Sequence, residues 1–136
     1  MERKTKTNLT NADLMQFTGG LRRYRTWANP NVIFTEGVEY LARNTEAFWL
    51  IDCITSYFGT RLMHNAMRQD ERLKSLQFWR LEVDEDRSAT VTARADTGVE
   101  PFVTQEIEFT DFPLDSVDIW AGFDGTRWTL YLPSEH

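Results

Sequence analysis

The sequence predicts an α+β domain in which helices pack on one face of an antiparallel meander of about five strands. Up to about residue 75, apolar residues recur at the three- and four-residue steps of helices, and afterwards they alternate with polar residues. Helices followed by strands are typical of α+β folds. The 136 residues are enough for one domain, with a mainly helical part over 1–75 and an antiparallel sheet over 76–136.

The helical part is organised around residues 35–58, the long stretch richest in apolar side chains. Asn44-Thr45-Glu46 interrupts the helical spacing, which predicts that one short helix ends there and a second begins. We expect Phe48, Ile51 and Ile54 to be buried against the sheet, because the helix has the apolar surplus to cover it. Two further helices are predicted at residues 11–17 and 61–74.

The strands are predicted by alternation of apolar and polar side chains, which suits an antiparallel sheet with one buried face. They are expected at residues 77–83, 89–95, 102–109, 117–120 and 127–132. The links at 84–87 and 96–98 are short enough for hairpins. Val32-Ile33-Phe34 is either a short strand or an apolar lead into the central helix.

The net charge of −6 is distributed unevenly along the chain. Residues 1–30 carry six Lys and Arg against two Asp and Glu, whereas residues 76–136 carry four against thirteen. One interpretation is a solvated acidic face of the sheet. The other is a molecule with a basic end and an acidic end, each of which steers a different partner.

Cysteine content and hydropathy indicate a cytoplasmic protein. Cys53 is the single cysteine, so the chain forms no internal disulfide, which is the usual state in a reducing compartment. The longest apolar run has five residues, Ala47–Ile51, which is far too short to cross a membrane. The first residues are basic and then polar, unlike a signal peptide. We therefore expect no membrane association.

Motifs for catalysis or cofactor binding are missing from the sequence. It contains no glycine-rich phosphate loop, no hydrolase or metalloprotease motif and no Cys/His metal spacing. We therefore expect no cofactor, no metal site and no catalytic residue, with His64 an ordinary helix residue and Cys53 an inert core group. Asp52 lies between apolar neighbours, so it is interpreted as the partner of a buried ion pair or as a general base in a pocket.

The strongest candidate for a binding surface is the segment of Arg22, Arg23, Tyr24, Arg25 and Trp27. Arginine pairs with carboxylates and phosphates, and arginine and tyrosine are favoured anchors of interfaces. The alternative is that these arginines neutralise the acidic sheet of the same molecule. The negative net charge argues against general binding of nucleic acid.

Much of the chain resembles a small family of bacterial proteins. The resemblance is carried by Phe34–Asp52, Thr104–Leu114, Leu130–His136 and the motif Gln16–Gly19 followed by Tyr24 and Trp27. That family is a domain of unknown function found in bacteria, phages and plasmids. The resemblance implies a free-standing single domain of a mobile element and transfers no activity, cofactor or catalytic residue. The link over 59–75 is longer and more basic than the family pattern.

Together these observations favour a non-enzymatic accessory or inhibitory protein of a bacterial mobile element or phage. We expect its partner to be another protein, and the sequence leaves a homo-oligomer open. The alternative is an enzyme or small-ligand-binding domain with a pocket between the helices and the sheet near Asp52.

Overall fold

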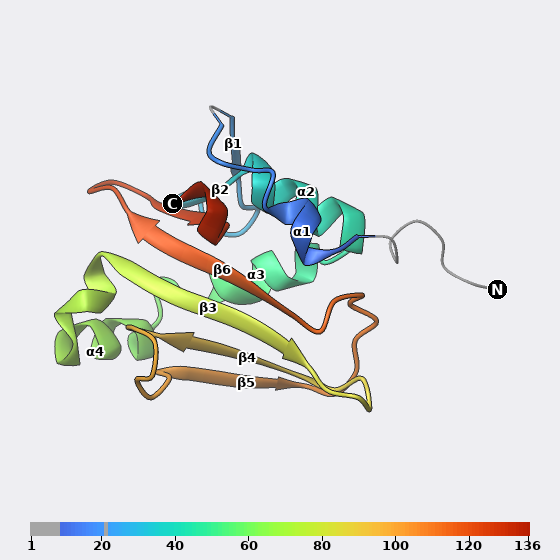
Figure 1. The fold of residues 1–136 in the computed structure, drawn as a ribbon. Coiled ribbons are helices and arrows are strands. Elements are labelled where there is room, and N and C mark those ends of the chain that lie inside the picture. Colours follow the sequence, from blue (N-terminus) through green and yellow to red (C-terminus); the bar gives the residue numbers. More distant parts are fainter. Residues whose placement is uncertain (1–8, 21) are drawn as a thin grey trace.

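A mixed β-sheet forms the centre of the protein (Figure 1). The computed structural model describes residues 9–20 and 22–136. Within these residues the sheet has seven strands in the order β1-β2-β7-β6-β3-β4-β5. The strands are β1 Arg23–Arg25, β2 Val32–Thr35, β3 Leu76–Val83, β4 Ala89–Arg94, β5 Val103–Ile107, β6 Ser116–Phe123 and β7 Trp128–Tyr131.

The α+β class is confirmed, but the prediction of a purely antiparallel meander of five strands is wrong. Strand β2 joins the sheet parallel to β7, and β1 continues the sheet beyond β2. All four residues of β2 are buried, so both faces of this short strand are covered, and β1 and β7 flank its two edges. For Val32-Ile33-Phe34 the sequence allows either a short strand or an apolar lead into the helix, and the structure forms a strand.

The order of the later strands also differs from a meander. The hairpins β3–β4 and β4–β5 are antiparallel neighbours as expected, but β6 pairs with β3 and not with β5. The chain thus returns from β5 to the other side of β3, as in a Greek key. Strand β3 thus lies between β4 and β6, and its Trp79 and Leu81 are 1% exposed.

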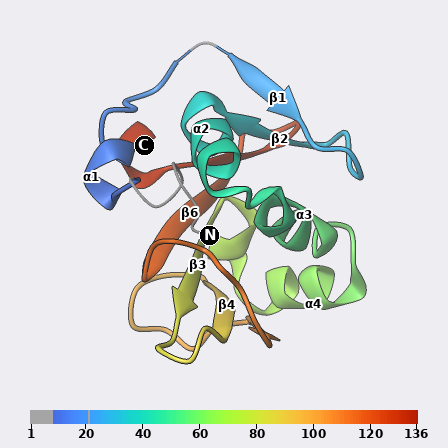
Figure 2. The same ribbon diagram turned by 90° about the vertical axis from the view of Figure 1, so that its right-hand side faces the viewer.

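The helices are short, and most of them precede the long strands. They are α1 Asn11–Leu14, α2 Glu36–Thr45, α3 Phe48–Ser56 and α4 Arg61–Gln69, together with the 3₁₀ helices η2 Glu71–Lys74 and η3 Pro133–Glu135. Figure 2 shows α3 and α4 on the same side of β3 and β4. No helix in residues 9–20 and 22–136 is long and apolar enough to cross a membrane.

The predicted interruption of the central helix is confirmed. Helix α2 ends before Glu46, which adopts a left-handed conformation with φ of 55°, and α3 begins at Phe48. The helix predicted over 61–74 is likewise divided at Asp70, where α4 gives way to η2. The Asp70 carboxylate accepts a hydrogen bond from the Arg72 backbone, which caps the N-terminus of η2. The same carboxylate forms an ion pair with the Arg72 guanidinium at 2.8 Å.

The core lies between α3 and the sheet. Leu50 and Ile54 face the side chains of Trp79, Val91 and Ile119 across this interface. Ile51 and Ile54 are 3% and 1% exposed, so their predicted burial is confirmed.

The predicted burial of Phe48 is wrong, because this side chain is 44% exposed. At roughly 100° per residue, Phe48 lies about 120° around the helix from Ile54. It therefore falls at the margin of the buried stripe.

The other face of the sheet carries aromatic and charged side chains. Phe78 and Trp120 contact edge to face with ring centroids 4.9 Å apart. Beside them, the Arg80 guanidinium donates to both oxygens of Asp118 at 2.9 Å. These four side chains are half-buried, so this face, called the open face below, is less covered than the face against α3.

Replacing Ile54 by alanine should lower the free energy of unfolding by about 2–5 kcal/mol, because a fully buried side chain leaves a cavity. Phe48→Ala should cost less than half as much, since part of its ring already contacts solvent. Urea unfolding of the two variants measures both values. An equal loss for the two substitutions would contradict this placement of α3.

Candidate functional site

The predicted binding segment forms an edge strand and the turn after it. Arg22, Arg23 and Arg25 are exposed, whereas Tyr24 is half-buried and stacks on Phe34 with ring centroids 5.4 Å apart. Among the residues that the structure describes, none of the three arginines forms an ion pair, so they do not fold back on the acidic strands there.

The structure does not bring all five predicted residues onto one surface. Tyr24 is paired with Phe34, whose side chain joins the core, so its neighbours Arg23 and Arg25 project to the open face. Trp27 lies in the turn after β1 and is 89% exposed. An exposed tryptophan of this degree is unusual unless a partner covers it.

Within the described residues, Asp52 lies neither in a buried ion pair nor in a pocket, the two environments that the sequence suggested for it. Its side chain is exposed, and it forms no ion pair within the described part of the chain. The interface between α3 and the sheet next to it holds no space for a water molecule. The pocket expected beside Asp52 is therefore not formed there.

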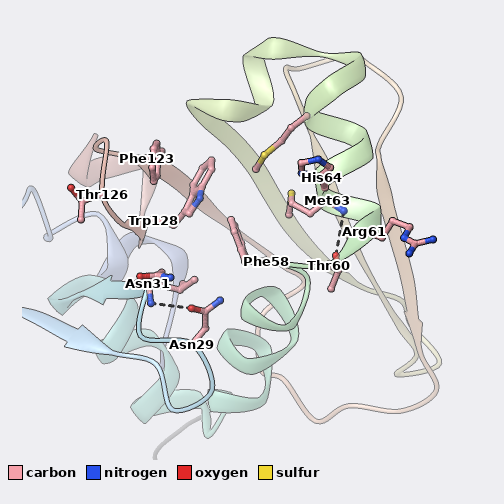
Figure 3. A pocket seen from close by; sticks show the side chains of 13 residues that line it. Asn29, Asn31, Phe58, Thr60, Arg61, Met63, His64, Phe123, Thr126 and Trp128 are labelled. Carbon is pink, nitrogen blue, oxygen red and sulfur yellow. Dashed lines mark hydrogen bonds between the residues drawn. The ribbon is translucent and has the colours of Figure 1, made fainter.

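A groove of about 650 Å³ lies instead at the end of the sheet where α3 turns into α4 (Figure 3). One wall comes from the turns β1–β2 and β6–β7, the other from α4, and Phe58 lies between them. The groove is lined by Asn29, Asn31, Val32, Phe58, Gly59, Thr60, Arg61, Met63, His64, Met67, Phe123, Thr126 and Trp128.

The turn after β1 is fixed by its own polar groups. The Thr26 hydroxyl donates to the carbonyl of Asn29 at 2.6 Å, and the Asn29 side chain accepts from the backbone of Asn31 at 2.9 Å. The backbone of Trp128 donates to the carbonyl of Asn31 at 2.8 Å, which ties this turn to β7. The first wall is thus preformed. Trp27 belongs to the same turn, two residues before Asn29, but does not itself line the groove.

The turn between β6 and β7 completes this wall. The Asp124 carboxylate accepts hydrogen bonds from the backbone of Arg127 at 2.7 Å and of Thr126 at 2.8 Å. These bonds lower the pKa of Asp124 because they stabilise its charged form. Phe123 and Trp128 contact each other across the turn with centroids 5.1 Å apart.

The opposite wall is positioned by Gln77, which is 0% exposed. Its side-chain amide donates to the carbonyl of Leu73 at 3.0 Å and to the sulfur of Met63 at 3.3 Å. Its side-chain oxygen accepts from the Trp79 indole at 3.0 Å. Met63 is in turn the N3 residue of α4, and its backbone donates to the N-cap Thr60.

The groove is lined mainly by apolar and uncharged polar side chains. Its lining residues include one histidine and one arginine but no carboxylate and no cysteine, so no acid–base pair is formed among them. The described residues contain no cluster of three potential metal ligands. An apolar floor with a polar rim fits a large apolar side chain of a partner.

The groove is also more basic than the rest of the molecule. Residues 26–34, 58–69 and 123–128, which form its walls and floor, carry three arginines and one aspartate. The whole chain has a net charge of −6. The three arginines outnumber the one aspartate, so the local field favours a negatively charged partner.

Sequence reasoning missed this groove. The prediction of a helix over 61–74 assigns no binding role to Met63, His64 or Met67. A weak signal was available, because methionines on a surface helix are common at adaptable binding surfaces.

The chain belongs to a family of unknown function (DUF6876), whose match covers residues 8–136. The description of this family assigns no activity to the groove. Neither the curated proteins nor the solved structures contained a match to the chain.

Cys53 should be inert toward thiol reagents in the folded protein. Burial raises the pKa of its thiol, and the Sγ atom lies 3.4 Å from Gln105 Oε1, which also accepts from Tyr57. Labelling with a chromogenic disulfide should be slow in buffer and complete after denaturation. Rapid labelling of the native protein would show that the thiol is activated.

Gln77→Leu should destabilise the protein by about 1–3 kcal/mol for each partner left without a hydrogen bond. The partners are the Leu73 carbonyl and the Trp79 indole. Gln69→Leu is the matched control, since Gln69 is exposed at the end of α4. Thermal unfolding measures the midpoint temperature of both variants. Equal midpoint temperatures would contradict this role of Gln77.

Proposed function

We propose that this protein is a non-enzymatic binding module that captures a segment of another protein in the groove between α4 and the turns β1–β2 and β6–β7. The segment it fits has a large apolar side chain flanked by Asp or Glu. The observation that carries this proposal is the groove of about 650 Å³ with Trp27, 89% exposed, in the turn that forms its rim.

The apolar part of the partner is argued from the groove floor. Phe58 contacts Trp128 with ring centroids 5.0 Å apart, and Met63 and Met67 line the facing wall. Methionine side chains adapt to apolar groups of different shape, and aromatic rings supply area at low entropic cost. Trp27 adds a contact next to the groove, where a partner would shield it from water.

The acidic part of the partner is argued from charge. Arg61 lines the groove and Arg68 lies on the same helix, and α4 contains no acidic residue. Neither arginine forms an ion pair with another described residue. An acidic segment would gain these pairs, whereas a basic one would be repelled.

A catalytic role is less well supported by the same geometry. His64 is the one histidine among the lining residues, and none of them is a carboxylate or a cysteine that could act as its acid–base partner. The alternative of an enzyme or ligand-binding pocket near Asp52 lacks support, because that side chain is exposed.

We also propose a cytoplasmic setting and an accessory or inhibitory role in a bacterial mobile element or phage. The cytoplasmic setting is supported by Cys53, the single cysteine, which forms no internal disulfide. The mobile-element setting is supported by the sequence resemblance alone.

Selection from a random peptide display library tests the proposed specificity. Peptides that bind the wild-type protein should carry Asp or Glu around one large apolar residue. Trp27→Ala and Met67→Glu should each weaken a selected peptide at least about tenfold, since truncation of an interface anchor costs more than 1.4 kcal/mol.

Phe109→Ala is the matched control, because Phe109 is 68% exposed and lies just beyond β5, outside the groove. It should leave the affinity of the peptide unchanged. Selected peptides without acidic residues, or equal losses in all three variants, would contradict the proposal.

A further inference from the structure

The two edge strands of the sheet carry opposite charges. Figure 1 shows β1 at one edge and β5 at the other. The exposed charged residues at the β1 edge are Arg22, Arg23 and Arg25, and those along and just after β5 are Glu106 and Glu108. Among the described residues, neither glutamate and none of the arginines is engaged in an ion pair.

The charged side chains at the two edges also lie on the same face of the sheet. Directly paired residues of neighbouring strands point to the same face, as do residues two apart in one strand. Glu106 is paired with Thr90, and Thr90 is paired with Glu82. Glu82 lies two residues from Arg80, so Glu106 is on the open face. Arg25 is paired with Ile33, and Ile33 is paired with Thr129. The partner of Thr129 is Gly122, which lies on the open face because it is two residues from Trp120. Arg23 and Arg25 therefore share the open face with Glu106.

The directions of the edge strands suit antiparallel pairing between two copies. The neighbour relations from β1 to β5 are one parallel pair, β2–β7, and five antiparallel pairs. Strands β1 and β5 consequently run in opposite directions within one molecule. A second copy in the same orientation, placed beyond β5, would present its β1 antiparallel to β5 with both open faces on the same side.

We propose that copies of this chain associate head to tail, with β1 of one copy adding to β5 of the next. The sheet then continues from one molecule into its neighbour through backbone hydrogen bonds, as in other cases of strand addition to a sheet edge. In the antiparallel register that places Arg25 opposite Glu106, Arg23 lies opposite Glu108, so two pairs of opposite charge face each other.

The charge pattern selects this pairing over the symmetric ones. Two β1 strands would bring arginine against arginine, and two β5 strands would bring glutamate against glutamate, which is destabilising. Edge-strand charges normally prevent association, but here each edge repels its own kind and attracts the other. Such a contact is heterologous and continues into a chain of copies unless its rotation closes a ring.

This association uses other side chains than those that line the groove. Arg23 and Arg25 do not line it, and the charged residues of α4 do not lie at either sheet edge. A copy bound at β1 leaves the groove residues Phe58 and Met67 accessible to the partner proposed above.

Sedimentation velocity over a range of protein concentrations, up to about 1 mM, tests the proposal. The weight-average mass of the wild type should rise from 16.0 kDa to at least twice that value as concentration increases. It should fall back toward the monomer mass when salt is added, since the pairs are exposed. The reversal variants Arg23→Glu/Arg25→Glu and Glu106→Arg/Glu108→Arg should each remain monomeric.

An equimolar mixture of the two reversal variants should associate again, because each then offers an edge complementary to the other. Arg61→Glu/Arg68→Glu on α4 is the matched control and should associate like the wild type. If a reversal variant does not fold by circular dichroism, the corresponding glutamine substitutions replace it and should weaken association. A wild type that stays monomeric, an association that survives reversal, or a mixture that stays monomeric would each overturn the proposal.

Discussion

The buried side chain of Gln77 is the constraint on which the candidate site depends. An amide in an apolar core is stable only when its donors and acceptor are paired, and Gln77 finds its partners on η2, α4 and β3. Moving α4 away from the sheet would break the contact with Met63, and moving η2 would break the one with Leu73. Trp79, which shares this network, has its ring near those of Tyr57 and Phe58, so the end of α3 is held by the same centre.

A second polar anchor joins the end of the chain to the beginning of α2. The Glu135 carboxylate accepts hydrogen bonds from the Thr35 hydroxyl at 2.7 Å, the Leu132 backbone at 2.8 Å and the Gly37 backbone at 3.3 Å. A negative charge at a helix N-terminus is favourable. A Cβ atom at Gly37 would lie 2.8 Å from the Glu135 side chain, so glycine permits this approach. The contact holds β2 in place next to β7, and with it the turn that forms the groove.

What the sequence alone determined is local. The α+β class, the break at Asn44–Glu46, the burial of Ile51 and Ile54 and the alternation along β3 and β4 all follow from side-chain spacing within a short window. Such periodicity reports which side of an element faces apolar surroundings. Composition also singled out the Arg22–Trp27 segment as a candidate surface, and in the structure its three arginines and Trp27 are exposed whereas Tyr24 and Thr26 are not.

The tertiary structure decided which elements become neighbours, and this determined the candidate site. Val32–Thr35 is too short to show whether it is a strand, and its pairing with β7 depends on residues close to the other end of the chain. The sequence prediction placed Phe48 in the core, whereas in the structure this side chain lies at the margin of the buried stripe of α3 and is 44% exposed. The groove draws on three distant segments, and β1 and β5 become opposite edges through the strand order. These features arise from long-range packing, which no local pattern in the sequence records.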